Sequence, residues 1–103
     1  MQSLEGMRVA IVEDDPIMGE SLVQRLELEG ALPVWWCSGR DALDALAIDQ
    51  FDILVCDIRL PDMNGETLFR EAAPFLGAAP VIFITAFGDI DQAVRLVRAG
   101  AGV

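Results

Sequence analysis

Acidic side chains stand directly after two apolar stretches of the chain, and a hydroxyl stands at the end of a third. The residues are Glu13, Asp14 and Asp15 after the first stretch, Asp57 after the second, and Thr85 at the end of the third. Carboxylates brought together repel one another unless a cation joins them, and oxygen ligands favour Mg²⁺. An Asp carboxylate can also act as a nucleophile toward phosphorus. If the stretches converge, this set could bind Mg²⁺ and accept a phosphoryl group, to which Thr85 could donate a hydrogen bond.

Each of these residues also has an ordinary explanation when it is taken alone. Asp15 precedes a proline, which is typical of a helix N-cap, so we expect Asp15 to act mainly as a cap. Glu13 and Asp14 are then left as the metal-side pair. Asp57 alone would be a turn residue, the "PDMNG" segment after it an ordinary turn, and Thr85 a common strand residue. Their combination at three strand ends favours a functional site.

The elements that must position these residues alternate along the chain. Apolar runs predict four strands, at 7–12, 32–37, 52–56 and 80–85. Apolar residues at helical spacing predict four helices, at 16–30, 39–47, 65–76 and 89–100. The expected N-caps are Asp15, Ser38, Asn64 and Asp89, and the expected helix stops are Gly30 and Gly100. Such alternation is typical of a parallel α/β sheet, in which ligands bind beyond the carboxyl ends of the strands.

Composition limits the class of protein and the partners that it can bind. The chain has 103 residues, which suits a single domain. Its net charge of −10 argues against direct binding of nucleic acid. The longest apolar run, 79–87, is far too short to span a bilayer, and no secretory signal is visible. We therefore expect a cytoplasmic protein with no membrane partner, made of a flexible leader at 1–6 and one domain at 7–103.

Two pairs of residues suggest special chemistry but have a simpler explanation. Cys37 and Cys56 are the only cysteines, and if the first strand lies between the second and the third, strand spacing holds them too far apart for a disulfide. We expect both to be small core residues. Trp35 and Trp36 are adjacent in an expected strand and so must point to opposite faces. Packing on the two sides of the sheet is favoured over a platform for base stacking.

Three segments of the chain resemble a known family. "VAIVEDDP", "DILVCDIRLPDMNG" and "VIFITAFGDIDQAVRLVRAGA" together look like the receiver domain of two-component response regulators, in the right order from about Met7 to the end. The resemblance implies a flavodoxin-like, doubly wound parallel sheet in three α/β/α layers, with order 2-1-3-4 for the strands present. It also implies a signalling phosphoacceptor, which at most catalyses its own phosphorylation and dephosphorylation.

The resemblance implies a role for each site residue. Asp57 matches the phosphoaccepting aspartate, and Thr85 matches the switch hydroxyl that moves toward the phosphoryl group. Glu13 and Asp14 match the acidic pair that holds Mg²⁺, together with Asp57 and the backbone carbonyl of Arg59. The phosphodonor would be a sensor histidine kinase, and the output would pass to an effector domain or a second receiver. The last segment is most similar to receivers attached to transcription activators.

The chain departs from the family pattern near its C-terminal end. The family has a lysine in a fifth strand, but this sequence contains no lysine and stops at Val103, shortly after Gly100 and Ala101 begin that motif. Either the sequence is a truncated receiver, or it is a degenerate receiver that works as an interaction scaffold without phosphorylation. In both cases the fifth strand and fifth helix are missing. The fourth strand is then an open edge, which invites association with another chain.

Overall fold

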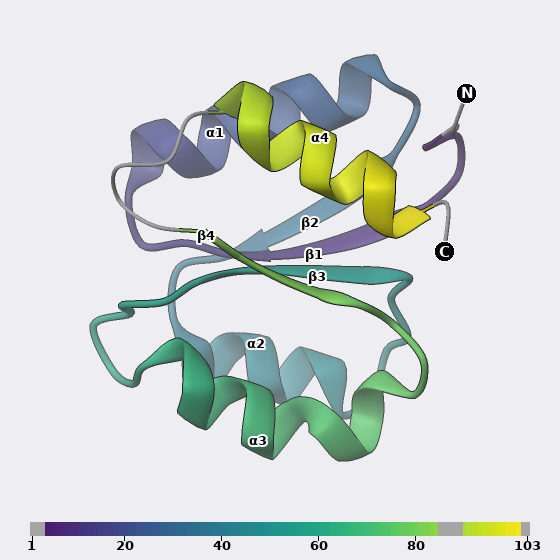
Figure 1. Ribbon diagram of the computed structural model, residues 1–103. Coiled ribbons are helices and arrows are strands. Elements are labelled where there is room, and N and C mark those ends of the chain that lie inside the picture. Colours follow the sequence, from purple (N-terminus) through teal and green to yellow (C-terminus); the bar gives the residue numbers. More distant parts are fainter. Residues whose placement is uncertain (1–3, 85–89, 102–103) are drawn as a thin grey trace.

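The computed structural model describes residues 4–84 and 90–101, which form strands and helices in strict alternation (Figure 1). The strands are β1 (Arg8–Val12), β2 (Leu32–Trp36), β3 (Ile53–Asp57) and β4 (Val81–Ile84). The helices are α1 (Pro16–Leu28), α2 (Gly39–Leu46), α3 (Gly65–Leu76) and α4 (Ile90–Ala101). Every predicted element is present, and only the end residues differ.

The strands run parallel in the order β2-β1-β3-β4. Parallel strands need crossover connections, and α1, α2 and α3 supply them. α1 and α4 cover one face of the sheet, and α2 and α3 cover the other (Figure 1). The prediction of a three-layer, flavodoxin-like α/β fold with strand order 2-1-3-4 is therefore confirmed.

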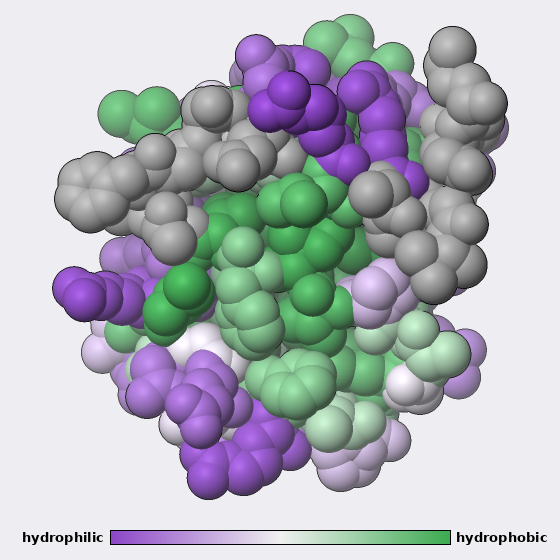
Figure 2. Space-filling view, in the orientation of Figure 1, coloured by the Kyte–Doolittle hydropathy of each residue, from purple (hydrophilic) through white to green (hydrophobic). Residues whose placement is uncertain are grey.

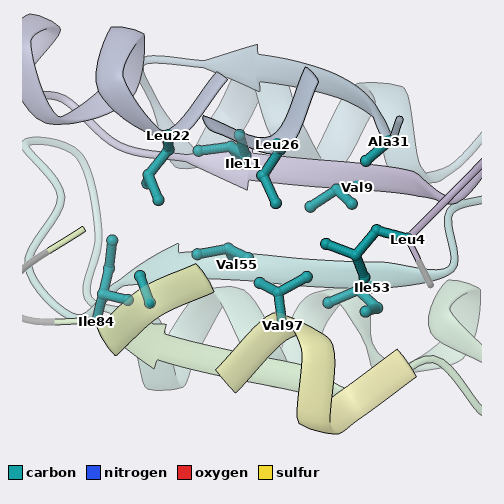
Figure 3. Close-up of a cluster of buried hydrophobic side chains, with 11 residues drawn as sticks. Leu4, Val9, Ile11, Leu22, Leu26, Ala31, Ile53, Val55, Ile84 and Val97 are labelled. Atoms are coloured by element: carbon teal, nitrogen blue, oxygen red, sulfur yellow. The ribbon is translucent and has the colours of Figure 1, made fainter. Parts of the chain in front are cut away.

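The inner strands are buried on both faces because helices cover both sides of the sheet. In β1, Val9 and Ile11 belong to the apolar cluster on the α1 side, while Ala10 and Val12 belong to the cluster on the α2 side. Every residue of β3 is buried as well. Figure 3 shows the α1-side cluster, in which side chains of β1 and β3 meet those of α1 and of α4, including Val97. Two-sided burial explains why these strands are continuous apolar runs in the sequence.

Polar side chains close the N-termini of three helices, as predicted. The caps are Asp15 for α1, Ser38 for α2 and Asn64 for α3, and each side chain accepts a hydrogen bond from an amide of the first turn. Gly30 lies just past α1 with a φ of 85°, a conformation that favours glycine. α4 continues to Ala101, so the predicted stop at Gly100 is wrong. The predicted cap Asp89 lies outside the described residues.

The core begins earlier in the chain than the sequence indicated. Leu4 is only 1% exposed and packs in the α1-side cluster. Next to it, the amide of Gly6 donates a hydrogen bond to the carbonyl of Gly30 at 2.9 Å. Residue 4 thus packs against the domain core in this structure. The division into a flexible leader at 1–6 and a domain at 7–103 stays a prediction.

The outer strands expose more of their side chains than the inner ones. β4 pairs with β3 and forms one edge of the sheet within the described residues. Figure 2 shows hydrophobic residues gathered over β4, between α4 and α3. Phe83 of β4 and Phe69 of α3 meet there edge to face, and they are 40% and 43% exposed. Within the described residues, β4 is thus an exposed edge of the sheet.

On the other edge, Trp35 packs on the α1 side of β2 and Trp36 on the α2 side, which confirms the prediction for this pair. Cys37, just beyond β2, is exposed, whereas Cys56 is buried, and neither forms a disulfide. The prediction of a core residue is thus right for Cys56 and wrong for Cys37. None of the described helices is long and apolar enough to cross a membrane.

Candidate metal centre

The register of the two inner strands brings the acidic residues together. Val12 pairs with Cys56, so the residues that follow Val12 lie beside Asp57 at the carboxyl edge of the sheet. Carboxylate oxygens of Glu13, Asp14 and Asp57 all lie within 4.8 Å of one another. The structure therefore contains the convergence of these three side chains that the sequence predicted.

Glu13 is the most enclosed carboxylate of the cluster, since it is only 2% exposed. Its side chain accepts a hydrogen bond from the amide of Asp15 at 3.2 Å, which favours the ionised form. Burial away from water, followed by the hydrogen bond to the Asp57 side chain and the negative charge of that group, nevertheless raises the pKa of Glu13 from 4.5 to about 8. Without a cation, Glu13 therefore tends to keep a proton at neutral pH.

Asp57 is the last residue of β3 and is 6% exposed. Its Oδ1 accepts a hydrogen bond from the amide of Arg59 at 3.0 Å, which fixes the rotation of the carboxyl group. Asp14, by contrast, is exposed. The cluster thus combines two enclosed carboxylates with one that faces water, so a small cation can approach from the side of Asp14.

The loop between β3 and α3 is fastened to a neighbouring helix by Asp62. Its carboxylate accepts hydrogen bonds from the amides of Gly39 and Arg40, both at 2.9 Å, at the N-terminus of α2. These two bonds lower the pKa of Asp62 below its ordinary value. Sequence reasoning treated this segment as an ordinary turn, because nothing in the local pattern indicates which helix the carboxylate will reach. The loop that carries Arg59 is therefore held at a second point, five residues after Asp57.

Residues 9–102 match the family described as the response regulator receiver domain. The chain belongs to this family. This receiver is 36% identical over 93 residues to the C4-dicarboxylate transport transcriptional regulatory protein DctD of Rhizobium meliloti, and 35% identical over 95 residues to the response regulator protein PmrA of Pseudomonas aeruginosa. The alignments cover 90% and 92% of this chain, but 20% and 43% of the two relatives. The chain thus spans less than half the length of these curated relatives.

One solved structure gives the same family for this receiver, and a second shows the same fold. The non-phosphorylated receiver domain of HemR from Leptospira biflexa is 32% identical, with a TM-score of 0.72, over 86% of this chain and 72% of that one. The receiver domain of the hybrid histidine kinase CckA has a TM-score of 0.83 over 91% of this chain and 98% of that one. Because the CckA domain is 24% identical, its likeness shows the fold alone.

The sequence also predicted roles at the site for Thr85 and Arg59. Thr85 lies outside the described residues, which stop at Ile84 on that side. Arg59 is described and exposed, and its amide contacts Asp57. Its carbonyl as a metal ligand stays a prediction.

The donor groups present fit Mg²⁺ better than a softer metal. All three ligand candidates are carboxylates, and the chain contains no histidine. Cys56 is close in sequence, but burial raises the pKa of its thiol to about 12, so it stays protonated and is a poor ligand. Burial, and after it the hydrogen bond and negative charge of Asp57, raises the pKa of Glu13, and a dication would offset that charge.

Proposed function

We propose that this receiver accepts a phosphoryl group on Asp57 from a sensor histidine kinase. Mg²⁺ would be held by Glu13, Asp14, Asp57 and the backbone carbonyl of Arg59. The observation that supports the proposal most directly is the packing of three carboxylates within 4.8 Å at the carboxyl edge of a parallel sheet. When bound, the ion would neutralise charge on the transferring group and help to orient it.

The transfer moves a phosphoryl group between two nucleophiles. A carboxylate oxygen of Asp57 forms a bond to phosphorus, and the phosphorus–nitrogen bond of the kinase's phosphohistidine breaks. The electron pair of that bond stays on the imidazole, which then takes a proton from water. The Arg59 amide, which donates to Asp57 Oδ1, limits the rotation of the attacking group. Hydrolysis of the acyl phosphate by water would later return Asp57 to its carboxylate form.

The added charge would then act as a switch. The hydroxyl of Thr85 would move toward the phosphoryl group, and the segment 85–89 and α4 would repack to form an output surface. DctD is named as a transcriptional regulatory protein, which supports control of transcription as the output. The output would pass through an effector domain or through pairing of receivers. The net charge of −10 disfavours direct nucleic-acid binding by this domain. In this proposal the protein acts in the cytoplasm as a phosphoacceptor, and Arg59 and Phe87 set water access to the phosphoryl group.

A matched pair of variants tests the proposal. The chain is incubated with acetyl phosphate and Mg²⁺, and its mass is measured by mass spectrometry. We expect a gain of one phosphoryl group in the parent chain and in Asp52→Asn, and no gain in Asp57→Asn. Asp52 is a suitable control because it precedes the same strand at its opposite end, where its carboxylate accepts a hydrogen bond from the Arg8 amide.

A parent chain that gains no mass would overturn this proposal. It would favour the alternative in which the receiver is a scaffold that binds partners without phosphorylation.

A further inference from the structure

The indole of Trp35 reaches the acidic cluster from the neighbouring strand. Its Nε1–H donates a hydrogen bond to the main-chain carbonyl of Glu13 at 2.7 Å, in partly buried surroundings. On the other side, the amide of Glu13 donates to the carbonyl of Trp36 at 3.0 Å. Both main-chain polar groups of Glu13 are therefore held by two consecutive residues of β2.

The indole ring of Trp35 also packs closely against Gly19 of α1. A Cβ placed on Gly19 would lie 2.2 Å from Cε2 and Cζ2 of the indole, closer than any side-chain carbon can approach. Glycine is unfavourable inside a helix because it has more backbone freedom to lose than alanine. The close approach of the ring gives a physical reason for glycine at this buried position of α1.

We propose that Trp35 is a positioning residue for the Mg²⁺ site, which acts on Asp14 through the Glu13–Asp14 peptide bond. This inference rests on the proposed function. A peptide unit is planar, so a hydrogen bond that fixes the Glu13 carbonyl also fixes the plane that carries the Asp14 amide and Cα. Asp14 is the exposed member of the cluster. An exposed side chain has more conformations to lose on binding a cation, so a fixed main chain beneath it favours binding.

The simpler alternative is that the indole only fills space and satisfies a partly buried carbonyl. Both alternatives predict that loss of Trp35 lowers stability, because the ring packs against the α1-side cluster. Only the positioning role predicts that Mg²⁺ affinity depends on the indole N–H.

Phenylalanine at each tryptophan position separates the two alternatives. Trp35→Phe keeps an aromatic ring at this position, beside Gly19, but removes the N–H donor. Trp36→Phe is the matched control, because this residue holds Glu13 through its main chain and packs on the opposite face against Phe51. The dissociation constant for Mg²⁺ is measured by titration calorimetry on the whole chain, together with the melting temperature. We expect roughly five-fold weaker binding in Trp35→Phe, the effect of one ordinary hydrogen bond, and no change in Trp36→Phe.

Fluorescence provides a second readout that does not depend on the folding of Trp35→Phe. The chain has two tryptophans, so Trp36→Phe leaves Trp35 as the single indole. We expect Mg²⁺ to change the emission of Trp35 in this variant, and Asp14→Asn to abolish the change.

The outcomes are distinct. Weaker Mg²⁺ binding in Trp35→Phe alone supports the inference, as does a Mg²⁺-dependent Trp35 emission. A lower melting temperature with unchanged affinity, or an emission that does not respond to bound Mg²⁺, would overturn it while leaving the proposed function in place. A parent chain that binds no Mg²⁺ would overturn the proposed function itself, and this inference with it.

Discussion

β3 and β4 are neighbours in the sheet, yet water reaches only one of them. All residues of β3 are buried, whereas most of β4 is at least partly accessible, including the large apolar Phe83. The difference does not come from residue type, since both strands are apolar apart from Asp57 at the end of β3. It comes from position: β3 has a strand on each side, whereas β4 has β3 on one side within the described part of the chain.

This difference matches the tasks that the proposed function gives to the two strands. The acceptor Asp57 ends the enclosed strand, where dense packing on both faces holds it in one place. Thr85, which would move in that proposal, directly follows β4 in the sequence.

The strongest test of the comparison is truncation of one apolar side chain in each strand. Leu54→Ala in β3 empties a fully buried position in the α2-side cluster, and we expect a loss of about 2–5 kcal/mol in the free energy of unfolding. Phe83→Ala in β4 should lose less, about 1–2 kcal/mol, because 40% of the side chain already lies in water. Urea denaturation measures both values, and equal losses would contradict the difference between the strands.

A second prediction concerns the charge that the inner strands enclose. The pKa of Glu13 is raised to about 8 in the folded chain, so the folded state keeps a proton that the unfolded state releases above its ordinary value of 4.5. Ionisation of Glu13 therefore destabilises the fold as pH rises from about 4.5 to about 8, and the full loss is reached above that range. The glutamine in Glu13→Gln does not ionise. The free energy of unfolding of this variant, relative to that of the parent chain, should therefore rise with pH by on the order of a few kcal/mol.

Urea denaturation from about pH 5 to about pH 9, with a chelator present, measures this relative stability. Added Mg²⁺ should reduce the difference, because the ion favours the ionised form of Glu13 in the parent. A constant difference across the pH range would contradict the enclosed position of this carboxylate.

The smallest effects should come from the exposed acids that follow the two strands. Asp62, in the loop after β3, accepts hydrogen bonds from two backbone amides at the start of α2. Asp62→Ala should therefore destabilise the fold by about 1 kcal/mol. Because the pKa of Asp62 is lowered, this contribution is present above the ordinary pKa of an aspartate and is lost as pH falls through the lowered value.

Asp91, on the helix after β4, forms an exposed ion pair with Arg25 of α1, and Asp91→Asn should cause no measurable change in stability. Thermal melting distinguishes the two, and the reverse order would contradict this assignment.

The elements and the acidic cluster could be predicted because they depend on patterns close together in the sequence. Two-sided burial makes β1 and β3 continuous apolar runs, and parallel strands place their carboxyl ends at one edge. The positions of Glu13, Asp14 and Asp57 follow from those two rules together. The caps Ser38 and Asn64 could be predicted equally well, because a cap is recognised from the sequence of the helix that it begins.

Contacts between segments far apart in the sequence could not be predicted in this way. The hydrogen bond from Trp35 to Glu13 depends on the rotamer of the indole, and the two bonds to Asp62 depend on the path of a loop. Leu4 is one apolar residue among polar neighbours, which is too little pattern to indicate burial. The roles of Arg59 and Thr85 rest on family resemblance and stay predictions.

One hydrogen bond at the end of the sheet has a mechanical consequence. The amide of Ile58, the residue after Asp57, donates to the carbonyl of Ile84 at 3.1 Å. Ile84 is covalently joined to Thr85. In the proposed function, this hydrogen bond would couple the main chain beside Asp57 directly to the main chain that leads to Thr85. A structural change caused by a reaction at Asp57 could then reach residue 85 through main-chain contacts, without a series of side chains between the two.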